Sequence, residues 1–418
     1  MDNFFIENNS RILPLFWIYV KYFSESFRIN YFKQNRQPVL MKFKFLFVFI
    51  LSCSLGFSQI KNREAGNFPE IDSTEVKADT TVLYKNKLLV FPLIALSTET
   101  SWVFGLANAY IFKTSKKDKK LRTSTMPSGF LYTLNKQILI GLGANIYLPK
   151  EKYIIRFENS FSKFPDKFWG IGNETPDSGK ESYTFTQFYI NPQLHRKIKN
   201  NFFLGAGWDF QSVYDIAYDA TGNFAKQEVL GIYQRGDYHV SGYSFFIMND
   251  SRNHTYQPNK GALLRIKFSN FNQHVGSDYN FQVVEADFRK FIKLSSNQTI
   301  AFQGLGTFTF GDVPYRNLAV LGGNVIMRGY YSGRYRDKNF FGSQVEYRFP
   351  IYWRIAGVGF TSVGQVANSV SDLGFDRFKL AIGAGIRVSI LPKEKLNLRF
   401  DIAQGNQLNY YVVLAESF

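Results

Sequence analysis

One pattern repeats from about residue 86 to the end of the sequence and restricts what the chain can fold into. Segments of roughly 10 to 14 residues alternate apolar side chains with small or polar ones, and turn-forming residues separate the segments. In residues 340–349, for example, Phe341 and Val345 share one face, whereas Gln344 and Glu346 share the other. One face suits lipid and the other suits a wet interior, so the pattern predicts the strands of a transmembrane β-barrel.

Sixteen segments of this kind follow one another, and we expect each to form one antiparallel strand. An even number of strands returns both ends of a single-chain barrel to the same side of the membrane. The expected strands are residues 88–97, 101–113, 121–133, 137–148, 152–162, 182–194, 200–213, 237–249, 261–271, 278–291, 297–310, 339–349, 354–366, 377–391, 396–404 and 409–418.

The gaps between these segments differ in length from one side to the other. Residues 163–181, 214–236 and 311–338 are long gaps that all fall on one side, and most opposite gaps, such as 149–151 and 292–296, are short. Outer-membrane barrels of bacteria have long extracellular loops and short periplasmic turns. We therefore place the three long loops outside the cell.

A soluble β-sandwich would also alternate apolar and polar side chains, so further features must decide between the two architectures. The expected strands have the length of a tilted membrane span of about 9 to 11 residues. Aromatic residues make up 18% of the sequence, which suits the aromatic girdles of a membrane barrel. The longest apolar run, residues 45–57, falls short of the roughly 20 residues that a membrane-spanning helix needs. We expect an all-β, 16-stranded antiparallel transmembrane barrel over residues 86–418.

The first 85 residues separate into three parts. Residues 41–58 have a basic start, a short apolar middle and a small-residue exit, which is typical of a cleaved secretory signal peptide. Residues 1–40 would bury that basic start inside the chain, so we interpret them as an upstream extension from a mis-assigned start codon, with a genuine extension as the alternative. Residues 59–85 are polar and predict a short periplasmic tail.

Cysteine content and charge narrow the partners of the chain. The single cysteine, Cys53, lies inside the expected signal peptide, so the mature chain would form no disulfide and no thiolate metal site. The formal net charge is +17 at pH 7, which attracts polyanions, although solvated lysines in loops and turns account for most of it. No nucleic-acid-binding motif accompanies the charge. The expected partners are outer-membrane lipids and lipopolysaccharide, and no nucleic acid.

The histidines predict neither an enzyme nor a metal site. His195, His239, His254 and His274 are scattered over a turn, a strand, a turn and a loop, without the spacing of metal ligands. A lipid-modifying barrel would need a serine and a histidine near its rim, and His239 is the one histidine on an expected strand. A single histidine on a barrel wall is more often structural. We expect no catalytic residue, no metal and no cofactor.

The segment LGGNVIMRGYYSGRYRD, residues 321–337, lies in the sixth expected extracellular loop. Its tripeptide Arg328-Gly329-Tyr330 resembles the Arg-Gly-aromatic tripeptide of the BamA/TamA superfamily (bacterial surface antigen D15) of outer-membrane assembly and translocation barrels. The resemblance implies that this loop folds into the lumen and that its arginine pairs with acidic groups on the inner wall. Glu346 stands at one matching acidic position, whereas Ser362 stands where the family has an aspartate. Either one carboxylate holds the arginine, or another acid substitutes.

A second segment, DSRNHTYQPNKGALLRIKF, is similar to the turn between strands eight and nine of the same family. The matching residues are Asp250, Arg252, Pro258 and Gly261, of which the proline and the glycine are turn-forming residues. Family members that insert or export proteins carry N-terminal POTRA repeats. Only residues 59–85 precede the first expected strand here, so the resemblance implies a member without POTRA domains.

The resemblance implies a role in the assembly or translocation of outer-membrane proteins or lipids through a seam between the first and the last strand. Pro92 lies in the first strand and lacks an amide donor, which leaves that edge short of hydrogen bonds, and Phe418 would end the last strand. Partners would then be client barrel proteins and a periplasmic accessory protein. The alternative is a passive pore or a surface-binding barrel that lost the assembly role together with the POTRA domains.

Overall fold

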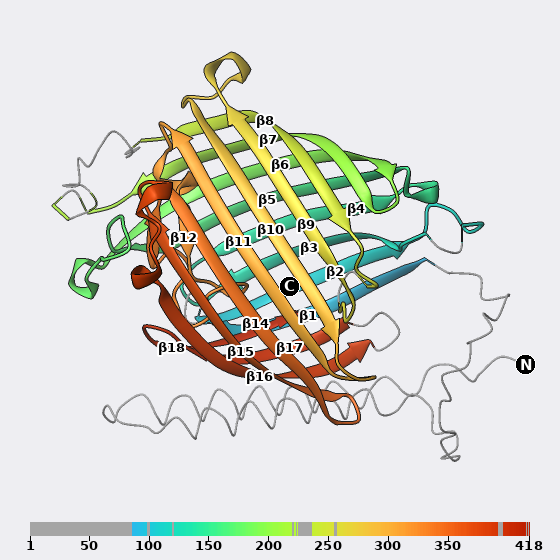
Figure 1. Cartoon of the computed structure of the whole chain (residues 1–418). Coiled ribbons are helices and arrows are strands. Elements are labelled where there is room, and N and C mark those ends of the chain that lie inside the picture. The colour runs from blue at the N-terminus through green and yellow to red at the C-terminus, as the bar shows by residue number, and fades with distance from the viewer. Residues whose placement is uncertain are drawn as a thin grey trace, which may run out of the picture. The chain divides into compact units, whose positions relative to one another are not determined.

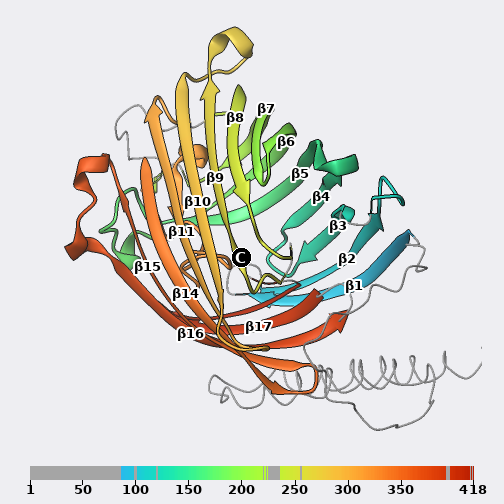
Figure 2. The same cartoon turned by 45° about the vertical axis from the view of Figure 1, so that its right-hand side comes forward.

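The computed structural model describes residues 86–418, except residues 98–100, 119–120, 220, 223, 225–235, 255–256, 392–395, 415 and 417. The expected extension, signal peptide and polar tail, residues 1–85, lie outside the described residues. The described chain forms a closed antiparallel barrel of sixteen strands, which Figure 1 and Figure 2 show from two sides. This architecture confirms the predicted fold class.

Each of the sixteen predicted segments forms one barrel strand, and two short strands that the pattern did not predict lie between β11 and β14. The additional strands are β12 (Ala319–Leu321) and β13 (Tyr335–Asp337), which pair with each other. The barrel strands are β1 (Lys87–Ser97), β2 (Ser101–Phe112), β3 (Ser124–Thr133), β4 (Ile138–Tyr147), β5 (Tyr153–Phe168), β6 (Glu181–Lys199), β7 (Phe202–Ala217), β8 (Tyr238–Asp250), β9 (Gly261–Phe271), β10 (Phe281–Lys293), β11 (Thr299–Gly311), β14 (Asn339–Tyr352), β15 (Ile355–Ala367), β16 (Lys379–Leu391), β17 (Leu396–Gln404) and β18 (Leu408–Leu414).

The two faces of the wall differ as the alternating pattern predicts. In β8, Ser244 and Phe246 are buried inside the barrel, whereas Phe245 is 54% exposed and Ile247 is 44% exposed on the outer face. Large apolar side chains that remain exposed all round the wall are what contact with lipid requires. Among the described residues, none belongs to a helix long and apolar enough to cross a membrane.

Strands β5 and β7 are longer than predicted, because their ends continue into a cap of aromatic side chains, whereas β6 gains most of its extra length at its other end, where it runs to Lys199. β5 and β6 pair along sixteen residues, from Tyr153 opposite Arg196 to Phe168 opposite Glu181. At this end the Tyr183 and Phe224 rings stack with centroids 5.1 Å apart, and Phe168 meets Phe224 edge-on at 4.9 Å. Stacked and edge-on aromatic pairs stabilise beyond the area that they bury. The cap therefore extends the strands on the side of the long loops.

The sixth loop on the long-loop side of the barrel, residues 312–338, turns back into the barrel. Its apolar side chains pack on the inner wall in one buried cluster that also contains residues of β14, β15 and β16. The members of this cluster are Ala319, Leu321, Ile326, Met327, Tyr330, Tyr335, Phe340, Val366 and Ala381. The loop therefore occupies part of the lumen, as the family resemblance implies.

Closure between the first and the last strand is the narrowest strand contact in the barrel. β1 pairs with β2 over eleven residues, but among the residues that the structure describes it pairs with β18 at a single position, Ser97 opposite Tyr411. The last strand is also shorter than predicted, because β18 ends at Leu414 instead of running to Phe418. The hydrogen-bonded contact that closes the barrel is therefore small.

The lipid-facing position of Phe245 gives the first prediction. Phe245→Arg places a charge against lipid, so we expect it to lower the free energy of unfolding in lipid vesicles by about 2–4 kcal/mol. Phe375→Arg is the control, because Phe375 is 97% exposed and lies in the loop between β15 and β16, outside the strands that form the wall. Equal effects of the two changes in denaturant titrations would show that Phe245 does not face lipid.

Candidate functional site

The turn at Met327, Arg328 and Gly329 brings an arginine into the middle of the barrel. Met327 has a φ of 57° and Gly329 a φ of 109°, so the backbone reverses within three residues. A Cβ on Gly329 would lie 2.6 Å from the amide nitrogen of Gly405, and therefore only glycine fits this approach between the loop and the β17–β18 turn. The side chain of Arg328 is completely buried.

Arg328 contacts two carboxylates, one amide and one aromatic ring. Its Nη2 lies 2.6 Å from Oε1 of Glu346 on β14, and its Nη1 lies 2.7 Å from Oδ2 of Asp401 on β17. Nη2 also donates to Oε1 of Gln344 at 3.2 Å, and the guanidinium carbon lies 3.5 Å from the centre of the Phe360 ring. A buried guanidinium is stable only if such partners replace its water.

Asp401 supplies the second carboxylate, and Ser362 does not. Ser362 is buried on β15 and its Oγ has no hydrogen-bond partner among the described residues. Its backbone neighbours are Gln344 and Ala381. Of the two possibilities that the sequence left open, the structure therefore shows the substitution of another acid. No signal in the sequence pointed to Asp401, because the surrounding residues, Arg399 to Ala403, have the pattern of an ordinary strand.

Further charges surround the two acids of the anchor. Arg348 Nη2 lies 2.8 Å from Oε2 of Glu346, and Arg387 Nη1 lies 2.6 Å from Oδ1 of Asp401. Arg387 also contacts Oε2 of Glu416 through its Nε at 2.7 Å. Glu416 fits no lipid-facing strand register in the sequence, and its place in this network explains why. We call Arg328, Glu346, Asp401 and the charged side chains that contact these two acids the lumenal anchor.

The C-terminal residue lies inside the barrel rather than on the seam, which corrects the expected role of Phe418. Figure 1 and Figure 2 both mark the C-terminus within the barrel. Phe418 is 5% exposed, its ring centre lies 6.1 Å from that of Phe291 on β10, and its carbonyl oxygen accepts a hydrogen bond from Arg348 Nη2 at 3.2 Å. Pro92 lies on β1 opposite Leu106 of β2, far along the strand from Ser97 at the closing pair.

The tripeptide next to the anchor also contacts the last strands directly. The amide of Gly329 donates to the hydroxyl of Tyr411 on β18 at 3.1 Å. The hydroxyl of Tyr330 donates to the carbonyl of Leu380 on β16 at 2.9 Å. Because Tyr411 is also the residue opposite Ser97 at the closing pair, one side chain connects the loop to the seam.

A second set of contacts holds the outer part of the same loop. Arg316 Nη1 lies 2.8 Å from Oδ2 of Asp166, and the guanidinium of Arg336 donates to the Tyr315 carbonyl at 3.1 Å. Burial by itself lowers the pKa of the Arg316 guanidinium, but the Tyr183 hydroxyl, which accepts a hydrogen bond from Nη1, and the Asp166 carboxylate raise this pKa above its ordinary value. Arg316 therefore stays charged, and the loop is held at two levels.

The turn motif between β8 and β9 forms a compact ion-paired structure at the short-turn end. Arg252 Nε donates to Oδ1 of Asp250 at 2.9 Å. Gly261 has a φ of 98°, and a Cβ there would collide with the carbonyl of Ser251. Pro258 is buried within the turn. The four residues of the motif therefore stabilise the turn itself.

The four histidines lie apart from one another and form no site. His195 is buried with its Nε2 3.0 Å from Oε1 of Gln193, and His239 lies 3.2 Å from the exposed carboxylate of Asp278. His254 accepts a hydrogen bond from the Gln257 amide within the β8–β9 turn. Over the described part of the chain no three His, Cys, Asp or Glu residues are placed to hold a metal ion.

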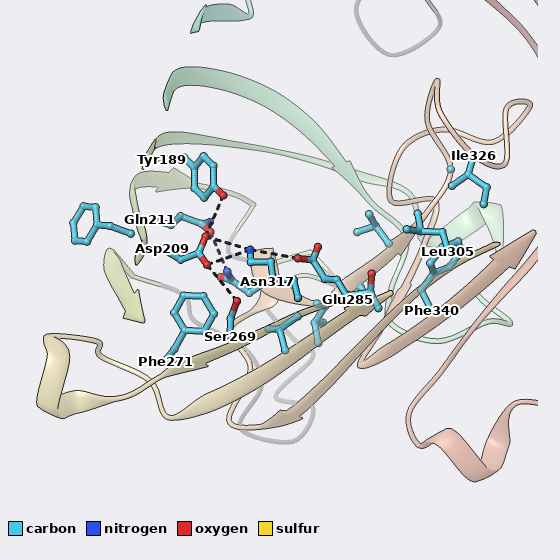
Figure 3. Close-up of a pocket in the computed structure, with 18 residues that line it drawn as sticks. Tyr189, Asp209, Gln211, Ser269, Phe271, Glu285, Leu305, Asn317, Ile326 and Phe340 are labelled. Atoms are coloured by element: carbon cyan, nitrogen blue, oxygen red, sulfur yellow. Dashed lines mark hydrogen bonds and ion pairs between the residues drawn. The ribbon is translucent and has the colours of Figure 1, made fainter. Parts of the chain in front are cut away.

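The loop leaves a cavity of about 360 Å³, lined by residues of β6, β7, β9, β10, β11 and β14 and by the loop itself (Figure 3). Asp209 is buried there and accepts hydrogen bonds from Asn191 at 2.6 Å, Tyr189 at 3.2 Å and Ser269 at 3.2 Å. Lys267 Nζ bridges Asp209 at 3.1 Å and Glu285 at 3.3 Å. The loop therefore narrows the lumen but does not fill it.

Comparison with known proteins assigns the family. The model of the Omp85 superfamily domain matches residues 142–409, which is more than half of the chain. The chain therefore belongs to the Omp85 superfamily, whose barrels reside in the outer membrane, and this membership confirms the BamA/TamA-like resemblance of the sequence.

Solved structures agree on the fold. BamA from Haemophilus ducreyi lacking POTRA domains 1-3 is 12% identical, with a TM-score of 0.54 over 79% of this chain and 70% of that chain. CdiB from Acinetobacter baumannii is also 12% identical, with a TM-score of 0.52 over 80% of this chain and 65% of that chain, so the chain spans just under two thirds of that CdiB. No curated protein matches the sequence.

The anchor gives the second prediction. Asp401→Asn leaves Arg328 buried with one carboxylate, so we expect a loss of about 3–5 kcal/mol in the free energy of unfolding, the cost of breaking a buried ion pair. Trypsin should also cleave residues 321–337 faster in the variant than in the wild type. Asp376→Asn is the control, because Asp376 is an exposed acid in another loop.

A rescue variant tests whether the lost carboxylate is the cause. Ser362→Asp in the Asp401→Asn background restores an acid at the position where the family has one, next to Gln344, which already contacts Arg328. We expect at least half of the lost stability and the slow trypsin cleavage to return. If trypsin cleaves the loop of Asp401→Asn no faster than the loop of Asp376→Asn, Asp401 does not hold the loop.

Proposed function

We propose that this barrel takes part in the assembly or translocation of outer-membrane proteins or lipids, and that client strands or lipids engage it at the seam between β1 and β18. The observation that carries the proposal is the pairing of these two strands at one position among the described residues, Ser97 opposite Tyr411, in a barrel whose other neighbouring strands pair at six positions or more. Family membership supports the same role.

The seam has the physical properties that strand addition requires. A strand edge presents backbone donors and acceptors that an incoming extended segment can pair with. Pro92 has no amide hydrogen and so cannot donate at its position on β1. Separating β1 from β18 therefore costs fewer hydrogen bonds than separating any pair of strands that is joined along its whole length.

The lumenal anchor would set how easily the seam opens. Tyr411 faces Ser97 across the seam and accepts a hydrogen bond from Gly329 beside the buried Arg328. Asp401 lies opposite Tyr411 on β17 and contacts Arg328. A movement of β18 away from β1 would disturb both contacts, so the position of the loop and the state of the seam are coupled in this proposal.

A disulfide across the closing pair tests the seam. In a strain depleted of the native copy, Ser97→Cys with Tyr411→Cys should fail to support function when oxidised and recover on reduction, because the covalent bond prevents β1 and β18 from separating. Each single cysteine variant is a control. Tyr411→Cys alone loses the hydrogen bond to Gly329 without linking the strands, so it distinguishes that loss from the effect of the disulfide. Full function of a completely oxidised double variant would exclude lateral opening.

A passive pore or a surface-binding barrel is the second candidate, and the cavity beside the loop is the observation that favours it. A conductive pathway would have to pass the loop residues that line this cavity, among them Gly322 and Ile326. Lipids, lipopolysaccharide and a periplasmic accessory protein are partners under the first proposal, whereas a pore needs only solutes.

Single-channel recording separates the two candidates. We expect purified wild-type barrel to conduct weakly and deletion of residues 321–337 to raise the conductance several-fold, because the deletion removes the part of the loop that lies in the lumen. The Asp376→Asn barrel serves as a control for handling and insertion. A large, steady wild-type conductance that the deletion leaves unchanged would favour the pore and contradict the plugging role of the loop.

A further inference from the structure

Two arginines on the inner wall converge near the short-turn end of the barrel, away from the lumenal anchor. Arg156 belongs to β5 and Arg265 to β9, and both lean toward β8 between them. Nη2 of Arg156 lies 3.5 Å from the sulfur of Met248, and the guanidinium carbon of Arg265 lies 5.4 Å from the centre of the Phe246 ring. Phe246 and Met248 are consecutive lumen-facing residues of β8, so they bring the two guanidiniums to one place.

The charges of this part of the wall leave these two arginines without a carboxylate. Several other basic side chains of this part of the barrel have an acid within ion-pair distance. These pairs are Arg122 with Glu151 and Asp250, Arg252 with Asp250, Arg289 with Asp287, and Lys267 with Asp209 and Glu285. Within the described ranges, neither Arg156 nor Arg265 comes within 4.0 Å of a carboxylate oxygen.

The neighbouring acids compensate the two charges only in part, because the buried Asp250, whose charge attracts Arg156, is itself paired with Arg122 and Arg252. The carboxylate closest along the same strand face is Glu158, which lies two residues further along β5 and forms no ion pair with Arg156 in the described structure. Asp287 is opposite Arg265 in the strand register, but Arg289 and Gln303 already hold it. The nearby His195 ring packs on Phe246 at 5.0 Å and contributes no negative charge.

Two buried guanidinium nitrogens make this arrangement unfavourable without a ligand. The Nε atoms of Arg156 and Arg265 are both inaccessible to solvent and have no hydrogen-bond partner among the described residues. Two like charges that lean on apolar side chains also repel each other more strongly than they would in water. An anion that accepts hydrogen bonds from both groups would remove the repulsion.

We propose that Arg156 and Arg265 bind a phosphate group in the lumen at the short-turn end of the barrel. Guanidiniums bind phosphate oxygens with paired, charge-assisted hydrogen bonds. A phosphate dianion balances two guanidinium charges, whereas a carboxylate balances one. The phosphate can be free in solution or belong to a lipid headgroup, and the experiment separates these sources. This site is independent of the seam and of the proposed assembly role.

Phosphate binding to the purified full barrel in detergent tests the proposal. Equilibrium dialysis with radiolabelled inorganic phosphate, at constant ionic strength set with chloride, should show saturable binding near one equivalent. Arg156→Gln and Arg265→Gln should each weaken binding at least tenfold. Arg196→Gln is the matched control, because Arg196 is an exposed arginine of β6. Phosphate should also raise the melting temperature of the wild type and of Arg196→Gln only.

Two results would overturn the proposal. One is saturable binding that survives the double variant Arg156→Gln with Arg265→Gln, since the phosphate would then sit on other basic groups. The other is a wild type that binds phosphate no better than Arg265→Gln. Arg156→Lys and Arg265→Lys keep the charge without the paired donors and should bind phosphate more weakly than the wild type, and an unchanged melting temperature in the absence of phosphate excludes misfolding as the cause. Competition by dihexanoyl phosphatidate would identify a lipid headgroup as the source, and its absence would identify free phosphate.

Discussion

The buried guanidinium of Arg328 is the interaction on which the interior of this barrel depends. An arginine with no exposed surface is stable only between carboxylates, and here Glu346 and Asp401 lie 2.6 and 2.7 Å from it. These two acids belong to β14 and β17, so the arginine attaches the loop to two separate strands of the wall. Together with the outer contacts of Arg316 and Arg336, this attachment holds the loop in the lumen.

The turn that carries Arg328 is also connected to the strands that close the barrel. Tyr411 connects the Arg328 turn to the single pair that closes the barrel, and Asp401 faces Tyr411 from the neighbouring strand. Beyond β18 the chain turns inward, where Glu416 contacts Arg387 and Phe418 packs on Phe291. The last residues therefore stabilise the interior instead of lengthening the closing strand, which is why the closure is narrow.

The rest of the lumen is polar but unevenly balanced. Around Asp209, the carboxylate accepts hydrogen bonds from Asn191, Tyr189 and Ser269, and Lys267 bridges it to Glu285. Closer to the short turns, Arg156 and Arg265 have no such acid. Two neighbouring arginines without an acid within ion-pair distance are informative, because buried like charges are costly.

The sequence by itself determined the sixteen strands, the two faces of the wall and the side that carries the long loops, because a period of two assigns every side chain to lipid or lumen. The family resemblance extended this to Arg328 and Glu346, which lie close together in the chain. It could not identify Asp401 or the positions of Glu416 and Phe418, because partners more than seventy residues from Arg328 depend on how the wall curves and which strands face each other. Only the tertiary structure decided that β1 and β18 meet at one pair, since a register between the two ends of a barrel is set by the tilt and closure of all the strands between them.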